Sequence, residues 1–152
     1  MVKSYRGVQK AKPAPASQKV SVSDYMSTKL ITFSADQHMD EVIDVLLKNK
    51  ISGGPVVNDA GELVGIISEG DCMKQVVKGK YNNMPNLNGT VADHMTDNVI
   101  SISPDLNIFD VANMFLEKRI RRFPVVNKGK LVGQISQKDI MRAVHILQSS
   151  TW

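Results

Sequence analysis

Two short motifs share the pattern Ser-x-x-Asp, which places a hydroxyl and a carboxylate where they could contact a phosphate and a sugar. They are Ser68-x-x-Asp71 and Ser136-x-x-Asp139, each at the expected start of a helix and after a strand that contains glycine. A serine hydroxyl beside the free N–H groups of a helix start suits a phosphate. A carboxylate one turn into the helix can accept hydrogen bonds from both hydroxyls of a ribose. The same two residues can also cap the helix, although aspartate is shorter than the glutamate or glutamine that usually makes the reciprocal bond.

A pair of adjacent arginines is the second group with an obvious chemistry. Arg121 and Arg122 directly precede a Phe-Pro-Val-Val run that is typical of a strand. A guanidinium offers five fixed donors, and these match phosphate oxygens in pairs. Without further context, two arginines at a strand edge are equally well explained as solvated surface residues. The residues alone therefore leave phosphate binding and a solvated strand edge both open for this pair.

The remaining reactive side chains form no catalytic or metal-binding set. The three histidines, His38, His94 and His145, have no metal-ligand spacing with one another or with Cys72. Cys72 is the only cysteine, so an intramolecular disulfide is excluded, and we interpret it as a small buried residue. No glycine run is followed by Lys-Ser or Lys-Thr, as a phosphate-binding loop would require. We expect no catalytic residue, no metal, no cofactor and no enzyme activity.

The elements that are expected to position these motifs occur twice in the sequence. Residues 24–26 return as 93–95, residues 55–58 as 124–127, and residues 65–71 as 133–139, at an offset of 69 and then 68 residues. A repeat held in register indicates one supersecondary unit used twice. A single copy would bury too little surface to be stable, so the copies are expected to share a core. The residues that match Arg121 and Arg122 are Ser52 and Gly53, so the two copies should offer unequal sites.

Each copy is predicted to run strand, helix, strand, strand, helix. In the second copy these are a strand over 99–102, a helix with Asn107 at its N-cap, a hairpin of 123–127 with 131–136, and a helix over 137–148. Apolar residues recur at helical spacing in both central helices. The last helix is expected to bury Ile140, Met141, Val144 and Leu147. In the first copy the central helix is entered through His38, and the last helix covers 71–78.

The positive charge belongs to the N-terminal segment. Residues 1–20 carry +5 and the whole chain +4, so the remainder sums to −1. The Pro-Ala-Lys composition of this segment predicts a disordered basic tail. Because the rest of the chain is nearly neutral, nucleic-acid binding is disfavoured. No apolar run approaches the length of a membrane span, and the single cysteine suits a reducing compartment, so we expect a cytoplasmic protein without a membrane partner.

The doubled pattern of helix, x-x-Pro-Val-Val, turn, Leu-Val-Gly-x-Ile-Ser-x-x-Asp and helix resembles a tandem pair of cystathionine-β-synthase (CBS) domains, a Bateman module. The resemblance covers residues 21 to about 148. It implies an α+β fold of two pseudo-symmetric β-α-β-β-α units packed face to face. The expected division is a tail over 1–20, one CBS domain over 21–78, a linker over 79–90 and a second CBS domain over 91–148.

The resemblance also implies a function. Such modules bind an adenine nucleotide in the cleft between their domains, often as dimers, and regulate a partner. The expectation is therefore a stand-alone sensor of AMP, ADP, ATP or a related adenosyl ligand, with a homodimer and an unidentified protein as partners. The nucleotide-binding residues carried over are Arg121, Arg122, Ser136 and Asp139, with an adenine wall from Ile51, Ser52 and the segment near Thr28. Ser68 and Asp71 form a second, weaker cleft. The alternative is a ligand-free interaction or scaffolding module.

Overall fold

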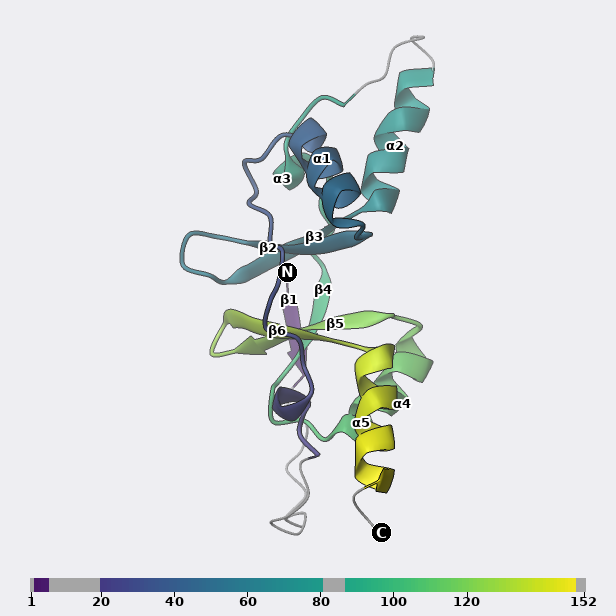
Figure 1. Ribbon diagram of the computed structural model, residues 1–152. Coiled ribbons are helices and arrows are strands. Elements are labelled where there is room, and N and C mark those ends of the chain that lie inside the picture. Colours follow the sequence, from purple (N-terminus) through teal and green to yellow (C-terminus); the bar gives the residue numbers. More distant parts are fainter. Residues whose placement is uncertain (1, 6–19, 81–86, 150–152) are drawn as a thin grey trace. The chain divides into compact units, whose positions relative to one another are not determined.

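The computed structural model describes residues 2–5, 20–80 and 87–149 (Figure 1). In chain order the elements are β1 (Val2–Tyr5), the 3-10 helix η1 (Val22–Asp24), α1 (Met39–Asn49), β2 (Gly53–Val57), β3 (Leu63–Ser68), α2 (Glu69–Lys80), α3 (Val91–His94), β4 (Val99–Ile102), α4 (Ile108–Lys118), β5 (Arg122–Asn127), β6 (Lys130–Ser136) and α5 (Gln137–Ser149). This mixture of helices and short strands confirms the α+β class.

The chain divides into two compact units. Of the described residues, the first unit holds Val2, 31–80 and 87–99, and the second holds 3–5, 20–30 and 100–149. The division crosses the repeat, because residues 20–30 of the first copy belong to the second unit and residues 91–99 of the second copy belong to the first. The domain boundaries that we predicted follow the sequence repeat instead of this division. Those boundaries and the face-to-face packing of the two domains stay predictions.

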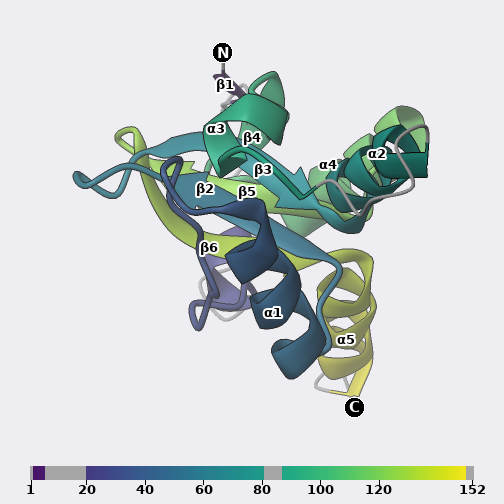
Figure 2. The same ribbon diagram turned by 90° about the horizontal axis from the view of Figure 1, so that it is seen from above.

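The first unit is built on the antiparallel β2–β3 hairpin, with α1, α2 and α3 on one side of it (Figure 1). Phe33 adds a parallel bridge to Val56 of β2. Thr96 adds an antiparallel bridge to Ile66 of β3, and the view from above places β3 near α3 (Figure 2). Its core consists of Phe33, Met39, Val42, Leu46, Val56, Ile67, Cys72 and Val91. The helices α1 and α2 contact each other over this core.

The second unit has a sheet of four strands in the order β1-β4-β5-β6. β4 is parallel to β5, and β5 forms an antiparallel hairpin with β6. Lys128 and Gly129 both have positive φ between these two strands, the geometry of a tight two-residue hairpin turn. The helices α4 and α5 contact each other on one side of the hairpin, where the rings of Phe115 and Phe123 stack with centroids 4.6 Å apart.

Each unit holds an exchanged segment that belongs to the other repeat, residues 91–99 in the first unit and 20–30 in the second, and a methionine of that segment packs against a strand glycine. A Cβ added to Gly133 would lie 2.6 Å from Sδ of Met26, and one added to Gly65 would lie 2.6 Å from Sδ of Met95. The next residue then pairs with the strand, as the 2.8 Å hydrogen bond from Ser27 N to the carbonyl of Gln134 illustrates. The glycines are therefore required by the close approach of the exchanged segment.

Most predicted elements are confirmed with nearly the expected bounds, but the predicted first strand of the first copy is wrong, because among the described residues only an isolated bridge from Phe33 to Val56 stands in its place. β4 is as predicted, and the side chain of Asn107 caps α4 by accepting the N–H of Phe109 at 2.8 Å. One burial prediction was wrong: Met141 is 64% exposed, and Ala143 is buried on α5 in its place. Helical periodicity indicates which face is apolar, but neighbouring elements decide how much of that face is covered.

The N-terminal residues required a further correction. Val2–Tyr5 lies in the predicted tail but forms β1 at the edge of the sheet. Ser4 and Ser101 share a hydrogen bond at 2.9 Å between their hydroxyls, and the ammonium of Lys118 lies 4.8 Å from the ring centre of Tyr5. These contacts come from residues remote in sequence, which local composition does not reveal. Residues 6–19 of the predicted tail, and 81–86 of the predicted linker, lie outside the described residues.

Candidate functional site

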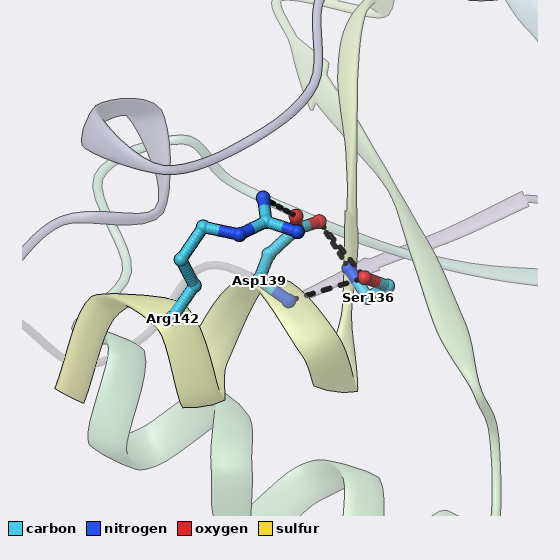
Figure 3. Close-up of polar contacts among 3 residues, drawn as sticks. All are labelled: Ser136, Asp139 and Arg142. Atoms are coloured by element: carbon cyan, nitrogen blue, oxygen red, sulfur yellow. Dashed lines mark hydrogen bonds and ion pairs between the residues drawn. The ribbon is translucent and has the colours of Figure 1, made fainter. Parts of the chain in front are cut away.

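Ser136 and Asp139 form a closed hydrogen-bonded corner where β6 passes into α5 (Figure 3). The carboxylate Oδ2 of Asp139 accepts the backbone N–H of Ser136 at 2.8 Å and its hydroxyl at 3.0 Å. The backbone N–H of Asp139 donates in return to Oγ of Ser136 at 3.2 Å. Asp139 therefore makes the reciprocal capping bond, although aspartate is shorter than the glutamate or glutamine that usually makes it. The helix-capping interpretation is thus correct for this motif.

Ser68 and Asp71 repeat this corner between β3 and α2 of the first unit. Oδ2 of Asp71 accepts the backbone N–H of Ser68 at 2.8 Å and its hydroxyl at 3.1 Å. Asp71 is only 6% exposed. In both units one carboxylate oxygen is committed to the serine, so that the other oxygen is the one available to a further donor.

The two arginines lie beside the Ser136 corner. Arg122 begins β5 and is the register partner of Ser136 on β6. The carbonyl oxygen of Arg121 accepts the N–H of Gln137, the first residue of α5, at 3.3 Å. Both arginines are exposed. The fold thus brings Arg121, Arg122, Ser136 and Asp139 to one end of the β5–β6 hairpin, as the sequence predicted.

The first unit has the same backbone arrangement without the cations. Gly53 is the register partner of Ser68, and the carbonyl of Ser52 accepts the N–H of Glu69 at 2.8 Å. A Cβ on Gly53 would lie 2.6 Å from the carbonyl oxygen of Ile67. The close approach of β2 to β3 therefore explains why a large residue cannot stand at this position as Arg122 does in the second unit.

The three remaining predicted residues are divided between the units. Ile51 lies just after α1 in the first unit, next to Ser52, and its N–H donates to the carbonyl of Leu46 at 3.1 Å. Thr28 belongs to the second unit and follows Ser27, which pairs with β6. That Ile51, Ser52 and Thr28 form one adenine wall remains a prediction.

Sequence analysis missed one residue of the Asp139 corner. Nη1 of Arg142, one turn further along α5, donates to Oδ1 of Asp139 at 3.2 Å (Figure 3). The Arg142 side chain is 65% exposed, whereas that of Asp139 is 13% exposed. The signal was available, because oppositely charged residues three apart on a helix are neighbours.

Other reactive groups lead to no second site. Burial raises the pKa of the Cys72 thiol, and the neighbouring Asp71 charge raises it further, so Cys72 is not an activated thiol. Within 2–5, 20–80 and 87–149, no three His, Cys, Asp or Glu side chains are grouped as metal ligands. A search of the same residues for helices long and apolar enough to span a membrane finds none.

Solved structures similar to this chain include two with bound adenosine compounds. The structure of CBSX2 from Arabidopsis thaliana in complex with AMP has a TM-score of 0.74 and 28% identity, covering 86% of this chain and 99% of that one. The CBS domain pair of MJ0100, in complex with 5′-methylthioadenosine and S-adenosyl-L-methionine, has a TM-score of 0.66 and 29% identity, covering 85% and 99%.

Relatives of similar sequence differ in length. The uncharacterized protein MJ1426 of Methanocaldococcus jannaschii is 32% identical over an alignment that covers 81% of this chain and 90% of that protein. MJ1225 of the same organism is 31% identical over 131 residues, but the chain spans only 44% of its length. The model of the CBS domain matches residues 22–78 and again 91–146. With both matches falling on the doubled strand and helix pattern, the chain belongs to the CBS-domain family and contains two tandem CBS units.

Proposed function

We propose that this protein is a regulatory module that binds an adenosyl ligand, AMP, ADP, ATP or a related compound, and thereby biases its contact with a second copy or a partner protein. The observation that carries the proposal is the corner of the second unit, where Arg121 and Arg122 adjoin the serine and aspartate of the α5 start. This corner combines groups for a sugar and for a phosphate within one unit.

The chemistry of the corner fits a ribose phosphate. The bonds from Ser136 orient the Asp139 carboxylate and occupy Oδ2, so a ligand donor would bind at Oδ1, which also accepts Nη1 of Arg142. Two exposed guanidinium groups next to the N-terminus of α5 supply positive charge for an anion. Because such donors match phosphate oxygens in pairs, a nucleotide is favoured over a nucleoside at this unit.

Similar proteins support the adenosyl class rather than one particular nucleotide. CBSX2 was solved with AMP, and the MJ0100 domain pair with 5′-methylthioadenosine and S-adenosyl-L-methionine. Adenine and a ribose with both of its ring hydroxyls are the part that these three compounds have in common, and their groups at the 5′ carbon differ in charge. The first unit lacks arginines at the positions of Arg121 and Arg122, so we propose that it takes an adenosyl group more weakly or without a phosphate.

The proposed regulation needs no cofactor, metal or chemical step. A ligand shifts an equilibrium between two arrangements only by the difference of its affinities for them. Binding must therefore favour one state of self-association or of partner contact. Sedimentation with and without ligand measures the self-association directly, and an unchanged association constant at saturating ligand contradicts regulation through contact with a second copy.

Isothermal titration calorimetry of the purified chain with AMP, ATP, adenosine and S-adenosyl-L-methionine tests the ligand class. We expect saturable binding of at least one of them and, from mass spectrometry of natively purified protein, release of an adenosyl compound. If no titration gives binding and no adenosyl compound is released, the proposal is wrong.

The alternative is a ligand-free interaction module, and exposed apolar side chains on the helices favour it. Leu47 and Leu116, at matching positions of α1 and α4, are 73% and 78% exposed. In that case Ser68, Asp71, Ser136 and Asp139 only cap helices. The calorimetric experiment separates the two functions, because an interaction module of this kind binds none of the four ligands.

A further inference from the structure

We propose that Arg142 lowers the selectivity of the second unit for ribose over deoxyribose, because it leaves Asp139 with one free acceptor position for sugar hydroxyls instead of two. This inference rests on the proposed function and deepens it. It follows from a count of hydrogen-bond acceptors at Asp139 and from the contrast with Asp71.

The Asp139 carboxylate has few acceptor positions left. An ionised carboxylate offers about four lone-pair positions, two on each oxygen. Oδ2 already accepts both the backbone N–H and the hydroxyl of Ser136. Oδ1 accepts Nη1 of Arg142 at 3.2 Å. One position therefore remains, whereas the vicinal diol of a ribose brings two donors.

The first unit lacks this restriction. Oδ2 of Asp71 is committed to Ser68 in the same way. Lys74 stands where the second unit has Arg142, but within the described residues no hydrogen bond or ion pair joins Lys74 to Asp71. Neither position on Oδ1 of Asp71 is then taken by a described residue, and the restriction at this corner is the burial of Asp71, which is 6% exposed, instead of a competing donor. The two corners, so alike in their capping bonds, differ in what they offer a sugar.

Two routes remain for a ribose at Asp139. It binds through one hydroxyl with Arg142 in place, or it displaces Arg142 and binds through both. Ion pairs with one well-exposed member change an equilibrium by less than about fivefold, so displacement carries a small but measurable penalty. A 2′-deoxyribose has one hydroxyl left on this edge and needs no displacement. Arg142 therefore lowers the ratio by which the second unit binds ribose more tightly than deoxyribose.

Calorimetric titration with AMP and 2′-deoxy-AMP tests this in wild type, Arg142→Ala, Arg142→Lys and Lys74→Ala. The quantity compared is the ratio of the two dissociation constants. Any pull of Arg142 on the phosphate is common to both ligands and cancels in that ratio. We expect the preference for AMP to rise about two- to fivefold in Arg142→Ala. Arg142→Lys should behave similarly, because the lysine of the first unit does not hold its aspartate.

Lys74→Ala is the matched control and should leave the ratio unchanged. An unchanged ratio in Arg142→Ala, with AMP still bound, overturns the role of Arg142 and leaves the proposed function standing. An equal rise in Lys74→Ala also overturns it, since any lost surface cation would then suffice. If wild type binds neither ligand nor any other adenosyl compound, the proposed function fails, and this inference fails with it. Arg142 is exposed, so its variants should fold, and a circular dichroism spectrum of each one checks this.

Discussion

Arg122 lies opposite Ser136 in the register of the β5–β6 hairpin. Side chains of antiparallel register partners start from the same face of the hairpin, with Cβ atoms about 5 Å apart. A phosphate that contacts the Ser136 hydroxyl is then within reach of the Arg122 guanidinium. In the first unit the partner of Ser68 is Gly53, so no side chain extends from that position.

The double change Arg121→Ala, Arg122→Ala is expected to remove the preference for AMP over adenosine. AMP affinity should fall, while adenosine affinity changes little, because contacts to the base and the ribose survive. Raising the salt concentration should weaken AMP binding more in wild type than in the double variant, since salt screens exposed charges. Calorimetry at two salt concentrations measures both effects.

Lys128→Ala, Lys130→Ala is the control for these arginines. It removes the same charge from the opposite end of the hairpin, at its turn. The control should retain the preference for AMP. A double arginine variant that also retains it would show that the arginines are solvated and that Ser136 and the helix start hold the phosphate without them.

Asp139→Ala should weaken adenine-nucleotide binding more than Asp71→Ala. Both changes remove the two bonds that the carboxylate accepts from a serine, and Asp139→Ala removes the ion pair with Arg142 in addition. Only Asp139 shares its corner with two arginines. Losing its contact to the ribose should cost about 1.5–3 kcal/mol, or about ten- to a hundredfold in affinity. Equal losses in the two variants, measured by calorimetry, would mean that the two corners are equivalent.

The chain is expected to form a homodimer through its helices. Exposed apolar side chains lie on the helices of both units, at matching positions for Leu47 with Leu116 and for Met73 with Met141, and a second copy would bury them. They are Leu47, Met73, Val76 and Val77 in the first unit and Phe109, Leu116, Met141 and Ile146 in the second. Light scattering at tens of micromolar should give the mass of two chains. Leu116→Glu should shift it towards one chain, whereas Lys130→Glu at the hairpin turn should not. A wild-type monomer contradicts the prediction.

Gly133→Ala and Gly65→Ala should each destabilise the protein. The added methyl would lie within about 3 Å of a methionine side chain and of a backbone carbonyl in both units. We expect a loss of about 1–3 kcal/mol in the free energy of unfolding, measured by urea denaturation. Gly70→Ala is the contrasting change, because its methyl meets only Oγ of Ser68, at 3.6 Å, and alanine favours the helix. Wild-type stability in the Gly133 variant would refute the tight packing.

Cys72 should react slowly with a thiol reagent in the native protein. Burial, and then the Asp71 charge, raises its pKa, so less thiolate is present at mildly alkaline pH than in the unfolded chain. The sign for stability follows, because the folded state holds this proton more tightly. Its contribution is complete below the ordinary thiol pKa and is lost as the pH rises through the raised value. Rates in buffer and in urea provide the comparison, and equal rates would contradict it.

Local patterns predicted the elements that depend on local interactions. The β-branched run of β4 and the Asn107 cap of α4 act over a few residues, so the sequence places them correctly. The strand Val2–Tyr5 could not be found in this way. Its hydroxyl contact from Ser4 to Ser101 spans 97 residues, and a strand of four residues is too short for its own pattern to identify.

In the candidate site, too, the sequence predicted the groups that depend on local motifs and missed a contact that depends on a side-chain conformation. The serine–aspartate corners and the nearby arginines followed from motif spacing, since each group lies within a few residues of a strand end. The pairing of Arg142 with Asp139 depends on which rotamer a long exposed side chain adopts. Helical spacing permits that contact without requiring it, as the separation of Lys74 from Asp71 demonstrates in the other unit.

The crossing of the repeat has a consequence for the order in which the chain leaves the ribosome. The first unit needs residues 91–99, which are made only after its hairpin and both of its long helices. Residues 20–30, made early, have no strand to pair with until β6 is complete, about a hundred residues later. Neither unit can close while only the first repeat has emerged. Gene fragments that separate the two repeats should therefore yield halves that fold only when both are present.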